Sequence, residues 1–141
     1  MAGRLRQTEV SLRRFNIPAP GQILYKLNDL AENATWIISH AGAIHNEKEN
    51  LEFVFEQAAR FHASCVVLQP FIGGNKRWAH IVLNALLTDL DFAPGTLIFG
   101  YDGKRYLDAI EKAAADQPDQ LATMILRGYI DLRGVYESGR Y

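Results

Sequence analysis

Residues 68–77 read LQPFIGGNKR and join two apolar segments of helical character. Pro70 removes a backbone donor and ends the first helix, while Gly73 and Gly74 allow a tight turn before the second. The first N–H groups of a helix lack partners and the helix macrodipole favours negative charge, so such a turn binds anions well. The Asn75–Arg77 segment adds an amide and two cations. The stretch therefore predicts a phosphate-binding loop.

The same turn chemistry also fits a simpler role. A glycine-containing turn often does no more than join two core helices, with its charged side chains in water. In that case Lys76 and Arg77 contact only solvent. Turn chemistry by itself leaves both roles open.

Helical periodicity runs through most of the chain and predicts an all-α fold. Apolar residues recur at three- and four-residue spacing, which is the pattern of amphipathic helices packed into a bundle. No alternating stretch is long enough to build a sheet, so we expect a compact helical bundle around a central helix–loop–helix. The expected helices cover residues 21–40, 47–68, 78–90, 104–116 and 118–132, with an N-cap at Asn46 and a loop or short strand over 91–101.

The same spacing predicts which side chains face the core. Ile23, Leu24 and Ile37 belong to the apolar stripe of the first helix. For the helix that follows the loop, the inward set is Trp78, Ile81, Val82, Ala85 and Leu86. For the helix over residues 104–116, it is Tyr106, Leu107, Ile110, Ala113 and Ala114.

Length and composition limit the class of protein. The chain has 141 residues, of which 48% are hydrophobic, and a formal net charge of −1. These values fit one globular domain and give no support for a basic nucleic-acid binder. No apolar run approaches the roughly 20 residues that span a bilayer. The single cysteine, Cys65, excludes an internal disulfide, and its apolar surroundings predict a buried thiol.

The first 20 residues form a region of different composition, which we call the N-terminal arm. It carries Arg4, Arg6, Arg13 and Arg14 against Glu9. We expect a solvated, partly ordered arm with a short helix before Asn16, followed by one helical domain over residues 21–141. The arm lacks the apolar segment of a secretory signal, so a cytoplasmic location is expected, with delivery by a specialised secretion system left open.

The stretch after Leu68 resembles the signature loop of the Fic/Doc (fido) family. That signature reads His-Pro-Phe, any residue, Asp or Glu, Gly or Ala, Asn, Gly or Lys, Arg. Six of its eight informative positions match here, and the flanking helices resemble the family over residues 47–128, including a histidine, His62, seven positions before Gln69. We call residues 69–77 the signature loop. The matching positions are Pro70, Phe71, Gly74, Asn75, Lys76 and Arg77.

The two mismatches fall at the positions that carry the family's chemistry. Gln69 stands where the family has its histidine base, and Gly73 stands where it has an acidic magnesium ligand. An amide cannot accept a proton at working pH. The resemblance therefore implies ATP or a related nucleotide as ligand, held by Gly74, Asn75, Lys76, Arg77 and His80, with Mg²⁺ disfavoured by Gly73.

The histidines do not form a convincing metal site. His40 and His45 flank the first interhelical connection, and His62 is expected to be a hydrogen-bonded core residue. His80 occupies the position of the family's second arginine and would be cationic only if its pKa allowed it. We therefore predict no metal ligands.

Three functions stay open at this stage. The first is a degenerate fido domain that binds a nucleotide and a protein partner, such as an active homologue or a toxin–antitoxin component, without efficient transfer. The second is an active transferase that modifies a protein hydroxyl by AMPylation or phosphorylation. The third is an unrelated helical adaptor. The sequence does not indicate the target, the oligomeric state or the function of the N-terminal arm.

Overall fold

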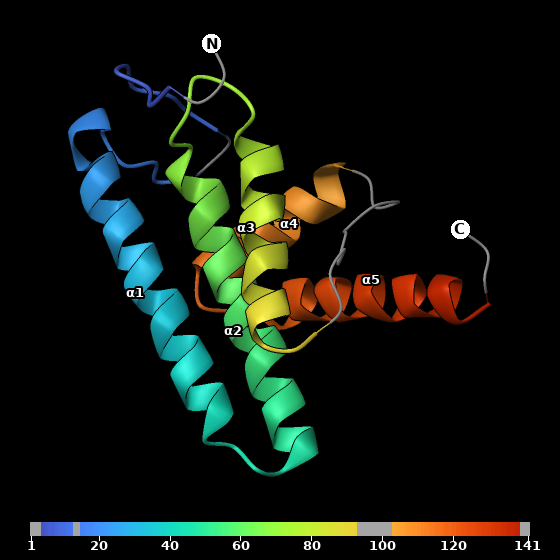
Figure 1. The fold of residues 1–141 in the computed structure, drawn as a ribbon. Coiled ribbons are helices and arrows are strands. Elements are labelled where there is room, and N and C mark those ends of the chain that lie inside the picture. Colours follow the sequence, from blue (N-terminus) through green and yellow to red (C-terminus); the bar gives the residue numbers. More distant parts are fainter. Residues whose placement is uncertain (1–3, 13–14, 93–102, 139–141) are drawn as a thin grey trace.

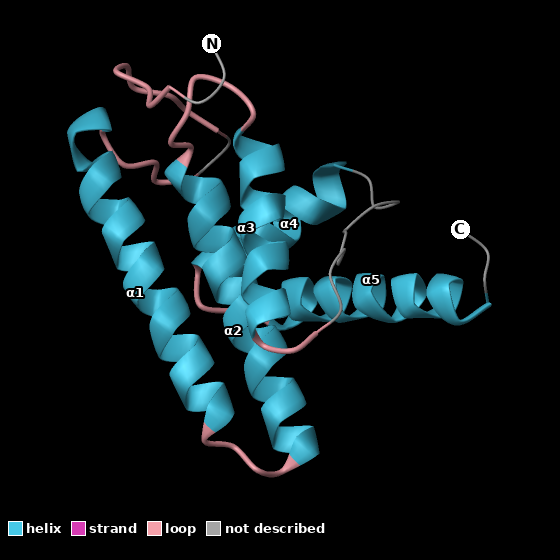
Figure 2. Ribbon diagram, in the orientation of Figure 1, coloured by secondary structure: helices cyan, strands magenta, loops and turns pink. Residues whose placement is uncertain are grey.

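The structure is a computed structural model that describes residues 4–12, 15–92 and 103–138, the last eight of these as backbone only. It contains the 3₁₀-helix η1 (Pro20–Gln22), and the α-helices α1 (Ile23–Gly42), α2 (Glu47–Leu68), α3 (Asn75–Asp89), α4 (Gly103–Ala114) and α5 (Asp119–Ser138). The described residues hold no strand (Figure 2), which confirms the predicted all-α class. The predicted loop over 91–101 lies mostly outside the described residues. No helix in the described ranges is long and apolar enough to cross a membrane.

Helix α2 is the centre of the bundle. It packs against α1, α3, α4 and α5, and α4 also packs against α5. Figure 1 shows α1, α2 and α3 running side by side, with α5 roughly perpendicular to α2 and α3, and the N-terminal arm at the same end as the α2–α3 connection. The signature loop therefore extends from the helix with the most neighbours.

The start of α2 follows from its capping residue. Asn46 has an extended backbone, and its side chain accepts a hydrogen bond from the Glu49 N–H at 3.0 Å. This bond satisfies one of the N–H groups that a helix leaves unpaired at its N-terminus. The predicted N-cap and the predicted range of this helix are confirmed.

The core is apolar and centred on α2. Fully buried side chains include Val54, Leu83, Ile110 and Ile125, from four different helices. Cys65 is buried and unpaired in this core, and burial raises the pKa of its thiol to about 12. The thiol is therefore protonated at neutral pH, as expected of a structural cysteine.

Four residues of the predicted inward faces are exposed in the structure. In α3, Ile81 is 60% exposed and Ala85 is also exposed, whereas Leu83 is fully buried. Residues two positions apart in an α-helix point about 200° apart around its axis, so burying Leu83 turns Ile81 to solvent. Helix α3 packs only on α2 and α1 among the described elements, and one face suffices. Leu24 in α1 and Ala114 in α4 are likewise exposed.

The N-terminal arm also differs from the prediction. Arg6 is only 3% exposed, and the described part of the arm contains no helix before η1, where a short one was expected. Leu5 forms an antiparallel bridge with Phe71. The Arg6 N–H donates to the Pro70 carbonyl at 3.0 Å, and the Ile72 N–H donates to the Arg4 carbonyl at 3.4 Å. The arm therefore packs on the signature loop, because backbone hydrogen bonds there outweigh the solvation of one arginine.

The position of α3 can be tested by paired truncations. Leu83→Ala should lower the free energy of unfolding by about 2–5 kcal/mol, because it leaves a cavity in the core. Ile81→Ala, on the exposed face, should change it by no more than about 0.5 kcal/mol. Urea denaturation measures both. A larger loss for Ile81→Ala than for Leu83→Ala would contradict the described orientation.

Candidate anion-binding site

The non-helical part of the signature loop, residues 69–74, begins and ends with residues in the left-handed region. Gln69 ends α2 with φ 46° and ψ 57°, and Gly74 precedes α3 with φ 77°. This conformation is easy for glycine but costs energy for a residue with a side chain. Gly73 has no positive φ, and a Cβ built there meets nothing within 4 Å. Of the two glycines, only Gly74 is required by the backbone.

The side chain of Asn75 holds the loop together. Its Oδ1 accepts from the Phe71 N–H at 2.8 Å, and its Nδ2 donates to the Phe71 carbonyl at 3.0 Å. Nδ2 also lies 3.2 Å from Oε1 of Gln69. Two hydrogen bonds to the backbone of one residue, Phe71, fix the path of the chain across the turn. Asn75 therefore shapes the loop from within, and its amide is already engaged.

The side chain of Gln69 is engaged as well. Its Nε2 donates to the Val66 carbonyl at 2.7 Å, and its Oε1 accepts from Asn75. Both ends of the amide thus bond to the protein. The side chain that occupies the position of the family's base stabilises the end of α2.

The backbone of the turn offers free donors. Among the described residues, the N–H groups of Gly73 through Arg77 have no hydrogen-bond acceptor, and the first helical bond of α3 is from Trp78 to Gly74 at 2.9 Å. These groups lie at the positive end of the α3 dipole. Lys76 adds a cation, and its Nζ lies 5.4 Å from the centre of the Tyr106 ring. The turn is electropositive, as an anion site requires.

A cavity of about 430 Å³ lies over this turn. Four of the six residues proposed from the sequence line it, namely Gln69, Gly74, Asn75 and Lys76. Helix α4 closes the opposite side. The full lining consists of Leu12, Val66, Gln69, Ile72, Gly73, Gly74, Asn75, Lys76, Gly103, Tyr106 and Leu107.

The other two proposed residues lie outside that lining. The side chain of Arg77 is exposed. His80 lies one turn further along α3, where its Nδ1 donates to the Lys76 carbonyl at 2.8 Å. Burial lowers the pKa of His80, so the ring is neutral at pH 7. A neutral ring cannot replace the charge of an arginine at this position.

Beneath the turn lies a small group of buried polar side chains. Nε2 of His62 is 2.6 Å from the Tyr106 hydroxyl, and the His62 and His80 rings are 5.0 Å apart. Burial lowers the pKa of His62 to about 3, with a further contribution from His80. Burial also raises the pKa of Tyr106 above its usual range. His62 is thus the hydrogen-bonded core histidine that the sequence predicted.

Two residues at this site were not predicted as site residues. Tyr106 was expected to face the core, and it also lines the cavity. Arg6 contacts the loop from the N-terminal arm, 63 residues away in sequence. A helical pattern pairs residues a few positions apart, so it carries no signal for such a contact.

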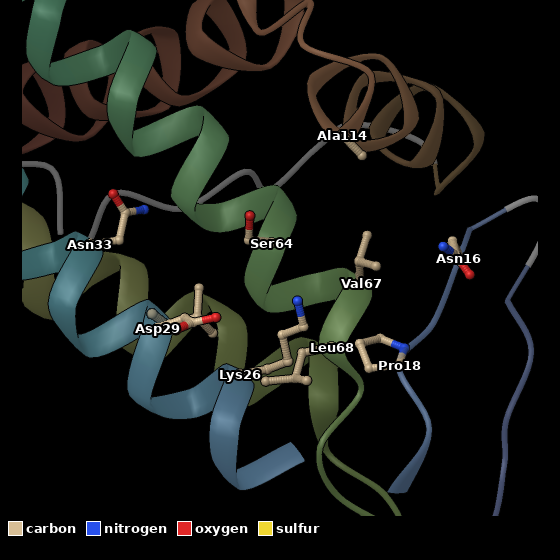
Figure 3. A pocket seen from close by; sticks show the side chains of 10 residues that line it. Asn16, Pro18, Lys26, Asp29, Asn33, Ser64, Val67, Leu68 and Ala114 are labelled. Atoms are coloured by element: carbon tan, nitrogen blue, oxygen red, sulfur yellow. The ribbon is translucent and has the colours of Figure 1, made fainter. Parts of the chain in front are cut away.

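A second cavity lies on another side of α2 and has a volume of about 400 Å³. Figure 3 shows side chains of α1 and α2 facing each other across it, with the N-terminal arm at one edge. It mixes a lysine with an aspartate and contains no residue of the signature loop, so it lacks the consistent positive character of the turn. The lining consists of Asn16, Pro18, Lys26, Asp29, Leu30, Asn33, Ser64, Val67, Leu68 and Ala114.

Comparison with known proteins agrees with the family resemblance of the signature loop. The Fic/DOC family model matches residues 1–87, a range that includes the N-terminal arm. The chain is similar to Protein adenylyltransferase fic-1 of Caenorhabditis elegans, with 31% identity over 94 residues. It is also similar to Protein adenylyltransferase Fic of Nematostella vectensis, with 30% identity over 112 residues.

The chain belongs to the Fic/DOC family. The aligned regions cover 66% and 79% of this chain but only 16% and 24% of those two relatives. The chain thus corresponds to a minor part of the curated proteins that it matches. The family match covers α1, α2, the signature loop and most of α3, and it ends before α4.

The cavity does not suit a magnesium ion. Magnesium prefers carboxylate oxygens and phosphates as ligands. The residues that line the cavity, within the described part of the chain, include no aspartate or glutamate. The oxygen of Gln69 already accepts a hydrogen bond from Asn75. The side chains that line the cavity therefore do not fit a magnesium ion as ligands.

The buried His62 makes stability depend on pH. Its folded pKa of about 3 lies below the ordinary 6.5, so the unfolded chain takes up the proton first. The contribution of the neutral, buried His62 to the free energy of unfolding is fully present above about pH 6.5. It is lost on acidification, by up to about 1.4 kcal/mol per pH unit. Between pH 7 and 5, His62→Gln should show a shallower fall in the free energy of unfolding than wild type. His45→Gln, at an exposed site, should match wild type, and equal slopes in all three would refute the assignment.

Proposed function

We propose that this Fic-family domain binds the phosphate groups of a nucleotide at residues 73–77 and acts with a protein partner, without efficient nucleotidyl or phosphoryl transfer. The observation that supports this most is the state of Gln69, whose amide is bonded at both ends. Binding and chemistry are then separable. The turn keeps its backbone N–H donors, whereas Gln69 places an amide where the family has its base.

The binding half of the proposal rests on charge and geometry. Unpaired backbone N–H groups at a helix N-terminus favour a phosphate through hydrogen bonds and the dipole. Lys76 borders the same cavity, where its ammonium can pair with a phosphate oxygen. The cavity volume of about 430 Å³ falls within the range of small-molecule sites.

The chemical half rests on what the residues cannot do. A general base must accept a proton and contributes typically 10²- to 10⁴-fold in rate. Gln69 cannot accept one, and the nearby His62 is buried and bonded to Tyr106. Phosphoryl chemistry also relies on a metal to stabilise developing charge, and Gly73 offers it no ligand. The chain therefore lacks both the general base and the metal ligand at these two positions.

Nucleotide binding should depend on Lys76. Lys76→Ala should weaken ATP binding about fivefold, the effect of losing about 1 kcal/mol from one partly solvated ion pair. Lys48→Ala, which removes the same charge at the far end of α2, should leave the affinity unchanged. Isothermal titration with and without Mg²⁺ gives both values, with little dependence on the metal expected. Equal affinities for the two variants would contradict a site at this turn.

A second function is favoured by the two relatives described above, which are both named protein adenylyltransferases. In this alternative the domain transfers AMP or phosphate from ATP to a protein hydroxyl with altered chemistry. Gln69 would orient the acceptor, while Lys76 and Arg77 would stabilise the transferred charge.

Radiolabelled ATP separates the two functions. We expect wild type to label no protein in a lysate above background, with label at either the α- or the γ-phosphate. The double variant Gln69→His/Gly73→Asp restores the base and a carboxylate, and a Cβ at residue 73 meets no atom within 4 Å. It should raise labelling by about 10²- to 10⁴-fold. Abundant wild-type labelling that Arg77→Ala abolishes would favour the transferase, whereas labelling that survives Arg77→Ala would exclude this site.

A further inference from the structure

We propose that Arg6 is the positioning residue of the anion-binding turn. Its guanidinium binds the C-terminal end of α2 and holds Gln69 in the left-handed conformation from which the signature loop starts. This inference rests on the proposed phosphate binding and extends it to the N-terminal arm.

One residue satisfies three successive carbonyl groups at the start of the loop. The Arg6 side chain donates to the Leu68 carbonyl at 3.2 Å and to the Gln69 carbonyl at 2.5 Å. Its backbone N–H donates to the Pro70 carbonyl at 3.0 Å. The chain thus leaves α2 through three peptide units that all bond to Arg6.

The same side chain also organises the arm. It donates to the carbonyls of Thr8 at 2.9 Å and Pro18 at 2.6 Å. A guanidinium carries five N–H donors in a fixed fork, so one arginine can join segments that are far apart in sequence. Arg6 therefore connects both ends of the arm to the end of α2.

A buried cation needs compensation, and the helix end provides it. Arg6 is 3% exposed, and its side chain donates to four backbone carbonyls. The last carbonyls of a helix lack intrahelical partners and carry about half a negative charge. The guanidinium meets both needs at once, in the way basic side chains stabilise helix C-termini.

The consequence for the turn is electrostatic as well as conformational. The C-terminus of α2 and the N-terminus of α3 meet at the signature loop, so the negative end of one dipole lies near the anion site made by the other. Arg6 offsets that negative end. It also stabilises the positive φ of Gln69, which a residue with a side chain adopts at a cost. Without Arg6, an anion would meet partly uncompensated carbonyls and a less defined loop.

The test compares Arg6→Met with Arg4→Met in the full chain. Each removes one positive charge and keeps the backbone, and the Arg4 side chain is exposed. ATP affinity should fall about tenfold or more for Arg6→Met, because the anion then meets uncompensated carbonyls and a less defined loop, and stay within about twofold for Arg4→Met. Amide NMR signals of Gln69, Phe71 and the Asn75 side chain should shift only in Arg6→Met, at a temperature where circular dichroism shows both variants folded.

Unchanged loop signals and unchanged ATP affinity in folded Arg6→Met would overturn the proposal. If Arg6→Met does not fold, hydrogen exchange in the wild-type protein tests the proposal instead. There the Arg6 Nε–H should exchange with solvent far more slowly than that of Arg4, and equal exchange would overturn the proposal. If wild type fails to bind ATP, the proposed function fails, while the loop signals and the exchange rate still decide the function of Arg6.

Discussion

The structure depends on how α2 ends. This helix contacts each of the other α-helices, so the direction in which the chain leaves it fixes the loop relative to the whole core. The exit requires a left-handed Gln69, three carbonyls bound by Arg6, and a two-way bond between Asn75 and Phe71. These bonds are internal to the loop and the arm. The turn that follows keeps its N–H groups free as a result.

In the proposed function, this arrangement separates binding of an anion from chemistry on it. The donors at residues 73–77 belong mostly to the backbone, so they persist when side chains change. Proton transfer and metal binding depend on particular side chains, and Gln69 and Gly73 provide neither. The chain therefore combines a family fold and an electropositive turn with groups that stabilise the loop in place of the family's reactive ones. The polar group of His62, His80 and Tyr106 supports the turn from below in neutral form.

Much of the fold could be predicted from the sequence because its signals are local. The period of the apolar residues gave the helices, Asn46 and Glu49 gave the start of α2, and the lone histidine on an apolar face gave the buried His62. The exposed Ile81 could not be predicted, because a wide apolar stripe fits several rotations of a helix and only packing selects one. The contact of Arg6 with the loop spans 63 residues and joins a side chain to carbonyl groups, which every residue has. No residue pattern records such a pairing.

The central claim is that residues 73–77 hold the phosphates of a nucleotide. A crystal structure of the domain with a non-hydrolysable ATP analogue at saturating concentration tests it most directly. We predict phosphate oxygens within hydrogen-bond distance of the backbone N–H groups of the turn and of Lys76 Nζ. A nucleotide seated in the cavity between α1 and α2 (Figure 3), with the turn empty, would contradict it.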